Sequence, residues 1–353
     1  MKEILQAAVK FGASDIHIVP GRPPFLRIKG EMKSLKAEKL TAERTQELIF
    51  SVLSEKLIDK FKVDSELDTS VSAEGIGRFR LNVLIQKDGL GAVLRVIPVE
   101  IPKPEEIGID EKLLELIKTP RGMVLVTGPT GSGKSTTLAS MINEINKERR
   151  DHIITIEDPI EYVYPKKNCV ITQREIGSHS NSFKEALKRA MRQDPDVALV
   201  GEMRDLETIS AALTLAETGH LVFATLHTTD AAQTVDRIID VFPPFQQQQV
   251  RTQLSGVLRA VVCQQLLVTA DGVGRVAARE IMIVTSAISN LIREGKTHQI
   301  YSAIETGSQA GSKTLDKDLL ELVRKQKITR EAAITKSNNP KILKQNLSGG
   351  RGL

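Results

Sequence analysis

A glycine-rich segment at residues 128–135 has the residue types and spacing of a phosphate-binding site. It reads Gly-Pro-Thr-Gly-Ser-Gly-Lys-Ser and matches the pattern G-x-x-x-x-G-K-[S/T]. The apolar run Met123–Val126 before it predicts a strand, and the residues from Lys134 onward predict a helix. In this setting the loop N–H groups and the positive end of the helix converge on a β-phosphate. A chance glycine-rich turn is the alternative, and the two flanking elements argue against it.

The positions of this loop have separate expected roles in binding ATP and Mg²⁺. The Lys134 ammonium is expected to neutralise charge on the β- and γ-phosphates, and the Ser135 hydroxyl to ligate Mg²⁺. The other positions surround the phosphates. We therefore expect nucleotide contacts from Pro129, Thr130, Gly131, Ser132, Gly133, Lys134, Ser135 and Thr136.

Hydrolysis also needs a carboxylate that orients the attacking water, and two segments supply candidates. The predicted strand Val197–Val200 is followed by Gly201 and Glu202, so Glu202 is our expected catalytic base. Gly201 stands where an Asp usually does, so the metal-side carboxylate must come from elsewhere. The strand Ile153–Ile156 is followed by three acids within five residues, and the last, Glu161, is our expected Mg²⁺ ligand and second catalytic acid. A solvated turn or a helix cap is the alternative for such a cluster.

Two histidines flank the next predicted strand, Leu221–Thr225. His227 follows the strand end, on the side of the sheet where the phosphate loop lies, and we expect it to sense the γ-phosphate. For His220, a functional role and a structural hydrogen bond remain equally open.

The elements that must position these groups alternate between strand and helix after residue 104. This alternation predicts a largely parallel sheet covered by helices. Beyond Asp230 the sequence is predicted to be mainly helical, with one extended interruption around Gly274–Ile283. The basic residues from Lys341 onward predict a solvated tail.

The first hundred residues predict a smaller α/β unit. Thr41 is a plausible helix N-cap, and Phe79, Leu81 and Val83 alternate with polar Arg80 and Asn82 as in a half-buried strand. A Pro-rich linker at Val99–Pro104 marks a domain boundary. We predict an N-terminal domain at 1–98, a linker at 99–106, an ATPase domain at 107–335 and a flexible basic tail at 336–353.

Composition narrows the class of protein. The chain has 353 residues, 41% hydrophobic and 26% charged, which is typical of a globular protein with more than one domain. A net charge of +5 and 3% aromatic residues without Trp argue against a RecA-like nucleic-acid motor. Two isolated cysteines predict buried thiols and neither a disulfide framework nor a zinc site. No segment reads as a signal peptide or membrane span, so we expect a cytoplasmic protein.

Three further segments carry a family resemblance. Residues 156–161, residues 194–205 and residues 219–229 resemble the aspartate, Walker B and histidine boxes of the type II/IV secretion ATPases, in the same order and spacing. Over residues 1–330 the chain is similar to the pilus retraction branch, the twitching-motility motors. The resemblance implies an α/β fold with a PAS-like N-terminal domain and a RecA-like ATPase domain, with nucleotide between them.

The same resemblance implies partners and further site residues. It implies a homo-hexameric ring at the inner membrane, held there by a pilus platform protein. It also implies that Arg80 contacts nucleotide and that Arg95 acts as an arginine finger, although plain surface charges are the alternative for both.

Within the superfamily, pilus assembly and type II secretion are the alternatives to pilus retraction, and two sequence features help to distinguish them. The absence of an extra N-terminal region and of a tetracysteine metal site favours retraction. Ser289, in the helix predicted around residues 287–294, departs from the retraction signature, which has Arg there. A nucleotide-switched scaffold is a third class, and Glu202 argues against it because a scaffold needs no hydrolytic carboxylate.

Overall fold

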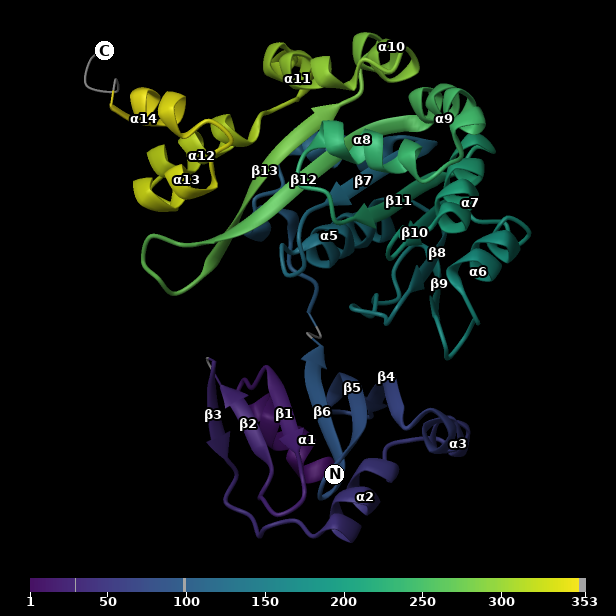
Figure 1. Cartoon of the computed structure of the whole chain (residues 1–353), viewed down its shortest axis with the longest axis vertical. Helices are drawn as coiled ribbons and strands as arrows, with labels where there is room; N and C mark the ends of the chain where they lie inside the picture. Colours follow the sequence, from purple (N-terminus) through teal and green to yellow (C-terminus); the bar gives the residue numbers. More distant parts are fainter. Residues whose placement is uncertain (29, 98–99, 349–353) are drawn as a thin grey trace. The chain divides into compact units, whose positions relative to one another are not determined.

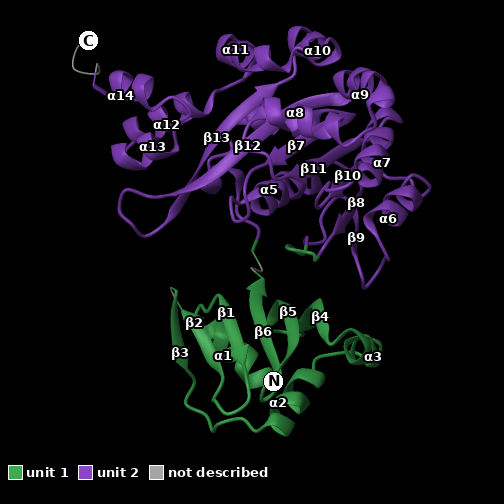
Figure 2. Ribbon diagram, viewed as in Figure 1, with its two compact units in different colours: residues 1–100, 159–163 green, residues 101–158, 164–353 purple. Residues whose placement is uncertain are grey.

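The structure, a computed structural model, describes residues 1–28, 30–97 and 100–348. The chain divides into two compact units (Figure 2). Unit 1 consists of residues 1–100 with 159–163, and unit 2 of residues 101–158 with 164–353. Residues 159–163 lie within the span predicted for the ATPase domain but group with unit 1. The predicted limits at residues 98, 106 and 335 stay predictions.

Unit 1 is built on a six-stranded antiparallel sheet with the order β3-β2-β1-β6-β5-β4 (Figure 1). The alternation predicted for β5 is confirmed, because Phe79, Leu81 and Val83 are fully buried while Arg80 is exposed. Thr41 caps α2 by accepting the Arg44 N–H, also as predicted. The elements are α1 Lys2–Lys10, β1 Asp15–Ile18, β2 Phe25–Ile28, β3 Glu31–Ser34, α2 Ala42–Phe50, α3 Glu55–Asp64, β4 Glu66–Ala73, β5 Gly77–Gln86 and β6 Gly89–Ile97.

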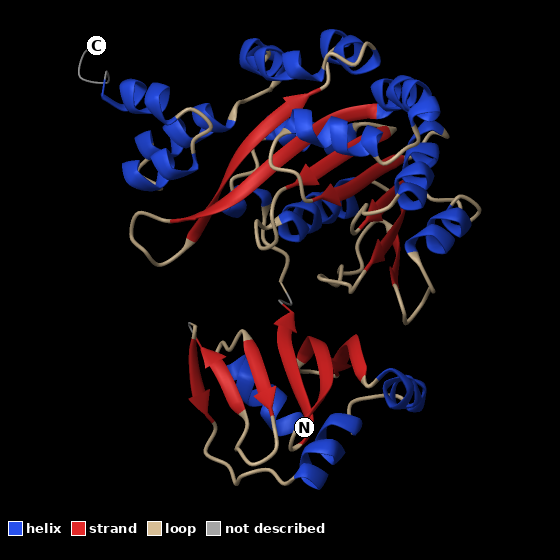
Figure 3. Cartoon of the chain, viewed as in Figure 1, coloured by secondary structure: helices blue, strands red, loops and turns tan. Residues whose placement is uncertain are grey.

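Unit 2 contains a seven-stranded sheet with the order β13-β12-β7-β11-β10-β8-β9 (Figure 1), and the strands are red in Figure 3. Every pairing in it is parallel except that of β12 with β13, so the predicted largely parallel sheet is confirmed. All six residues of β7 are buried, which requires cover on both faces of the sheet. Its strands are β7 Gly122–Thr127, β8 His152–Glu157, β9 Val170–Glu175, β10 Val197–Val200, β11 Leu221–Leu226, β12 Leu258–Val268 and β13 Arg275–Ile283.

Helices connect and cover these strands, and one hydrophobic cluster joins residues of α6 to α11 to the sheet. The α-helices are α4 Glu111–Leu114, α5 Lys134–Glu148, α6 Phe183–Ala190, α7 Leu206–Glu217, α8 Ala231–Asp240, α9 Pro244–Val257, α10 Ser286–Arg293, α11 Ile300–Thr306, α12 Leu315–Arg324, α13 Arg330–Lys336 and α14 Pro340–Ser348. The short 3-10 helices are η1 Pro104–Ile107, η2 Glu115–Lys118, η3 Thr297–Gln299 and η4 Ser308–Ala310. Across the described ranges, no helix combines the length and the apolar character needed to cross a bilayer.

Two strands of unit 2 were not anticipated. The segment of β12 was interpreted as helical, which is wrong: Leu258–Val268 forms an eleven-residue strand between β7 and β13. Its first half is buried on both faces, so its sequence lacks the alternation that distinguishes a strand. The edge strand β9, Val170–Glu175, was not predicted either.

The expectation of a flexible tail from residue 336 is wrong for residues 340–348. These residues form α14, whose Leu343 is only 1% exposed. Leu343 packs in a separate cluster with Leu315 and Leu319 of α12, and Leu347 of the same helix packs against this cluster, so two leucines fix the helix. Lys341 and Lys344 are exposed on its outer side. Residues 349–353 lie outside the described residues.

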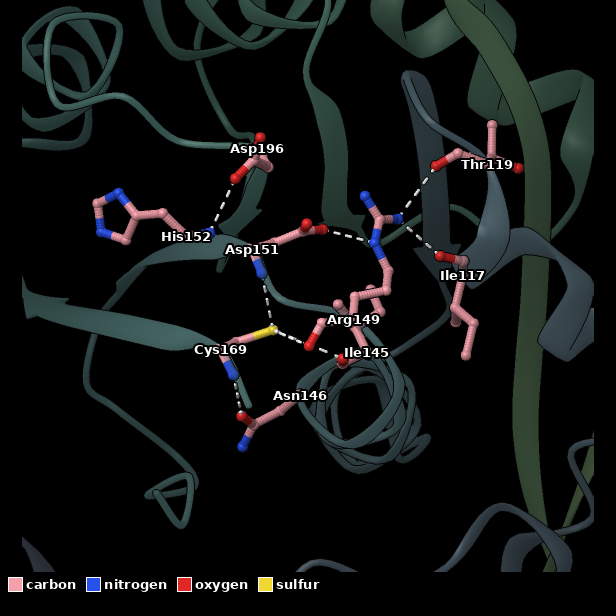
Figure 4. Close-up of polar contacts among 9 residues, drawn as sticks. All are labelled: Ile117, Thr119, Ile145, Asn146, Arg149, Asp151, His152, Cys169 and Asp196. Atoms are coloured by element: carbon pink, nitrogen blue, oxygen red, sulfur yellow. Dashed lines mark hydrogen bonds and ion pairs between the residues drawn. The ribbon is translucent and has the colours of Figure 1, made fainter. Parts of the chain in front are cut away.

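A polar network holds together the amino ends of β8 and β9 (Figure 4). Arg149, at the end of α5, donates from Nη1 to the carbonyls of Ile117 and Thr119 at 2.8 and 3.3 Å and pairs with Asp151 at 2.5 Å. The Cys169 thiol accepts the Asp151 N–H at 3.4 Å. Cys263 is buried as predicted, whereas Cys169 is only half-buried.

Candidate nucleotide-binding site

The phosphate loop has the predicted strand–loop–helix setting. It begins after β7 at Gly128 and passes into α5 at Lys134, with Gly133 as the N-cap residue in a left-handed conformation. Gly128 has φ +141°, and a Cβ there would lie 2.2 Å from the Gln264 carbonyl oxygen, so only glycine fits. In this loop Pro129, Thr130, Gly131 and Ser135 are exposed, Gly133, Lys134 and Thr136 are half-buried, and Ser132 is buried.

Lys134 folds back over its own loop. Its Nζ donates to the carbonyl oxygens of Gly128 at 2.7 Å and Pro129 at 3.2 Å. Burial lowers the pKa of Lys134, and the charge of Glu202 opposes this shift. The amine is therefore held at the loop, within electrostatic reach of the Glu202 carboxylate.

Gln264 of β12 holds the loop from the adjacent strand and was not singled out from the sequence. It is 3% exposed. Its Nε2 donates to the Ser132 carbonyl at 2.7 Å, and its Oε1 accepts the Thr137 hydroxyl at 2.9 Å. Both ends of the buried amide are thereby satisfied, which fixes the loop and the first turn of α5 relative to the sheet. A polar Gln-Gln pair inside an apolar run was the available sequence signal.

Glu202 lies two residues beyond β10 and has two partners. Its Oε1 is 2.9 Å from His227 Nε2 and 2.5 Å from Arg204 Nε. Burial acts to raise the pKa of Glu202, but Arg204, His227 and Lys134 outweigh it and hold the pKa below its usual value. Glu202 is thus an ionised carboxylate, fixed in position, in the electrostatic reach of the phosphate loop.

Gly201 explains the missing aspartate of this segment. A Cβ at position 201 would lie 3.1 Å from the Cα of Glu157, the last residue of β8. The close approach of β8 and β10 at this point therefore favours glycine, and Glu157 lies beside the position where an Asp is usual.

The two histidines have different roles in the structure. His227 follows β11 and contacts Glu202, as described above. His220 precedes β11 and bonds through Nδ1 to the Leu215 carbonyl at 2.8 Å and the Thr218 hydroxyl at 3.1 Å. His220 is therefore a structural residue at the opposite end of the strand.

The remaining predicted residues belong to unit 1. Arg80 of β5 and Arg95 of β6 are directly opposite each other in the antiparallel ladder, and Arg95 pairs with Asp15 at 2.9 Å. Glu161 groups with this unit, where burial raises its pKa against the charges of Arg80 and Arg95. The structure therefore associates Glu161 with the two arginines of unit 1.

Two observations bear on whether phosphate and Mg²⁺ fit this site. The buried Ser132 Oγ has no hydrogen-bond partner within residues 100–348, as expected for a loop that surrounds an anion. The Ser135 hydroxyl is exposed at the start of α5, Glu157 ends β8, and Glu202 follows β10 at the same edge of the sheet. Hydroxyl and carboxylate oxygens are the ligands that Mg²⁺ prefers, so the donor set fits.

A cavity of 730 Å³ opens beside the loop within unit 2. Gly133, Thr136 and Thr137 form one wall, η1 with the residues after it forms another, and β12 and β13 contribute Gln264 and Arg279. The volume is in the range of small-molecule sites.

The fold and this site define a P-loop nucleotide-binding protein. Residues 1–338 match the family model described as "Type II/IV secretion system protein", and the chain belongs to this family. It is 49% identical over 338 residues to the type IV pilus retraction ATPase PilT of Pseudomonas aeruginosa, covering 96% of this chain and 98% of that protein. It is also 49% identical over 316 residues to a twitching motility protein of Neisseria gonorrhoeae, covering 90% and 84%.

A solved structure gives the same result for the fold. The crystal structure of the pilus retraction motor PilT with bound ADP matches with a TM-score of 0.91 and 49% identity, over 97% of this chain and 98% of that chain. The fold is therefore that of an N-terminal domain followed by a RecA-like ATPase domain, as the sequence predicted.

Proposed function

We propose that this chain hydrolyses ATP to power the retraction of a type IV pilus. The observation that carries the proposal is the meeting of Lys134, Glu202 and His227 at one edge of the sheet, because these groups supply charge neutralisation and a positioned base. The near full-length similarity to PilT supports retraction as the work that is done.

In this proposal each residue has one task. The nine-residue segment Gly128–Thr136 surrounds the phosphates, and Lys134 exchanges its two loop carbonyls for phosphate oxygens. Glu202 accepts a proton from the water whose oxygen attacks the γ-phosphorus, while the bond to the β–γ bridging oxygen breaks and ADP leaves. His227 orients the Glu202 carboxylate and responds to the γ-phosphate.

Mg²⁺ is the implied cofactor. The Ser135 hydroxyl and a carboxylate, with Glu161 as our sequence-based choice, would hold it. When bound, it would neutralise charge on the β- and γ-phosphates. Glu157 is a second carboxylate for this role, because it ends β8 beside Gly201.

We further propose that the chain works as a homo-hexamer in the cytoplasm at an inner-membrane pilus platform protein. Arg80 and Arg95 would then contact nucleotide, as in the pattern that the family resemblance implies. Sedimentation of the purified protein with ATP should give a six-subunit mass, and a fully active monomer would contradict the ring.

The test of function is genetic. Deleting the gene in its host should abolish twitching and cause pili to accumulate on the surface. The wild-type gene should then restore motility, whereas the Glu202→Gln gene should not. A deletion strain without pili would instead assign the chain to pilus assembly. Unchanged pili together with a secretion defect would assign it to type II secretion.

A further inference from the structure

The long strands β12 and β13 form a hairpin (Figure 1), and one cross-strand pair in it consists of two buried polar residues. Gln264 and Arg279 are paired residues in its antiparallel ladder. Cross-strand partners direct their side chains to the same face of a sheet. They are 3% and 5% exposed, and both line the 730 Å³ cavity beside the phosphate loop. One rung of the ladder thus supplies two polar groups to the cavity wall.

Arg279 uses its guanidinium to hold the end of η1. Its Nη1 donates to the Gly108 carbonyl at 2.8 Å, and its Nη2 to the Ile107 carbonyl at 2.7 Å. Among the described residues no carboxylate forms an ion pair with this guanidinium, and its buried Nε has no hydrogen-bond partner. Burial lowers the pKa of Arg279, and the charges of Asp318 and Asp110 oppose this shift from a longer distance. The direct partners of the guanidinium are two carbonyls of one short segment, so this double contact fixes the position of that segment beside β13.

The segment that Arg279 holds is compact and follows the connection between the two units in sequence. Glu106 accepts the Lys103 N–H at 3.0 Å through its carboxylate, and the Ile109 N–H donates to the Pro104 carbonyl at 2.9 Å. Gly108 has φ +69°, which allows the tight exit from η1. These bonds make residues 103–109 one compact segment, and residues 101–103 connect it in sequence to unit 1.

The paired residues Gln264 and Arg279 also bond to the phosphate loop and to α12. Gln264 holds the Ser132 carbonyl of the phosphate loop at 2.7 Å. The main-chain N–H of Arg279 donates to Asp318 of α12 at 2.8 Å, and the same carboxylate pairs with Lys313 at 2.9 Å. The phosphate loop and η1 are therefore fastened to adjacent strands at one point, with the cavity between them.

We propose that Arg279 is a positioning residue that holds η1 as the wall of the nucleoside part of the ATP site, so that nucleoside binding orders residues 103–109. This inference rests on the proposed ATP binding. The phosphates are held by the loop, whereas the cavity extends past Gly133 and Thr136 to η1. Only a ligand that carries a nucleoside therefore reaches the wall that Arg279 supports, and only such a ligand signals to the connection with unit 1.

The test compares ADP with pyrophosphate, which occupies the phosphate loop alone. Arg279→Met and the more conservative Arg279→Lys should bind pyrophosphate as the wild type does. Both should bind ADP about tenfold more weakly, the change that corresponds to one lost hydrogen bond of the charged class. In hydrogen exchange, ADP but not pyrophosphate should protect residues 103–109 of the wild type, and this protection should be lost in the variants.

A matched control is Arg149→Met. Arg149 also donates to two carbonyls of a short helical segment, but it lies in the network of Figure 4 and does not line the cavity. Its removal should leave both affinities unchanged in protein that still unfolds cooperatively. Equal loss of ADP and pyrophosphate in the Arg279 variants, unchanged ADP binding in them, or the same selective loss in Arg149→Met would overturn the inference. A wild type that binds neither ligand would instead overturn the proposed function.

Discussion

Glu202 has one partner that is local in sequence and one that is distant. Arg204 is two residues away in sequence, whereas His227 comes from the end of the neighbouring strand β11. Both contacts involve Oε1, which leaves the second carboxylate oxygen to approach a water molecule. A lowered pKa keeps the carboxylate ionised, as a proton acceptor must be before the reaction.

Replacing this carboxylate should separate binding from hydrolysis. Glu202→Gln keeps the shape and the oxygen that His227 contacts but removes the base, so turnover should fall at least ~10²-fold while ATP affinity is retained. Steady-state hydrolysis and ATP binding by calorimetry measure the two effects. Unchanged turnover would show that another acid, with Glu161 the first candidate, accepts the proton.

Lys134→Ala, unlike Glu202→Gln, should abolish nucleotide binding. The ammonium is the main counter-charge that the loop offers to the β- and γ-phosphates. Among the described residues, no other lysine donates to the Gly128 or Pro129 carbonyl, so none can take its place. Calorimetry with ATP and with pyrophosphate should show no binding to this variant. An ATP affinity close to that of the wild type would contradict the role of Lys134.

Glu280 makes the stability of unit 2 depend on pH. It is 2% exposed on β13, and burial raises its pKa to about 7 from an ordinary value of 4.5. Because the folded-state pKa is the higher one, the stabilisation is fully present below about pH 4.5 and is lost as the pH rises through about 7. The size of this change is on the order of 3 kcal/mol.

Glu280→Gln should remove this dependence, because the amide oxygen can still accept the Ala231 N–H that Glu280 accepts at 2.9 Å. The variant should be more stable than the wild type at pH 8 and similar to it at pH 5, as read from thermal unfolding across this range. Glu305→Gln, at an exposed position on α11, is the control and should follow the wild type. Parallel pH profiles for wild type and Glu280→Gln would exclude Glu280 as the cause.

At the scale of elements, the sequence was sufficient where a pattern is local. The phosphate loop is contiguous, and the alternation in β5 needs no knowledge of its neighbours, so both were predicted. The contacts of Gln264 and Arg279 could not be, because they depend on the pairing of β12 with β7 and β13. β12 itself was missed because a strand buried on both faces has no alternation. His227 was expected at the functional end of β11 from its place after the strand, whereas the role of His220 stayed open until its bonds to Leu215 and Thr218 were seen.

The C-terminal helix α14 shows how little apolar surface is needed to order a basic segment. Leu343→Ala should destabilise the cluster of α12, α13 and α14 by about 2–4 kcal/mol, the usual cost of a Leu→Ala change in a core. Limited proteolysis should then cut residues 337–348 faster. The neighbouring Ile342 is 52% exposed, so Ile342→Ala is a matched control that should cut at the wild-type rate. Equal proteolysis rates for the two variants would show that Leu343 does not hold this segment and that it is a flexible tail.

At the scale of the whole molecule, the proposed site residues are divided between two units. Lys134, Glu202 and His227 belong to unit 2, whereas Arg80, Arg95 and Glu161 belong to unit 1. The two arginines are cross-strand neighbours on one surface of β5 and β6, where Asp15 pairs with Arg95 and the charges of both arginines act on Glu161. A proposed ring gives such a surface a use, because unit 1 of one subunit can complete the site on unit 2 of the next.

Mixing inactive subunits tests this division of the site. Arg80→Ala lacks only a group of unit 1, and Glu202→Gln lacks only a group of unit 2. If the site forms across subunits, a ring reassembled from equal amounts of both contains sites with both wild-type groups, about a quarter of the total for random mixing. The ATPase activity of the mixture should therefore rise well above that of either variant alone.

A mixture of Glu202→Gln with Lys134→Ala is the control, because both changes lie in unit 2 and no site can recover. A first mixture no more active than its parents would show that each chain completes its own site, or that Arg80 takes no part in it, and the ring would then have to couple subunits by other contacts.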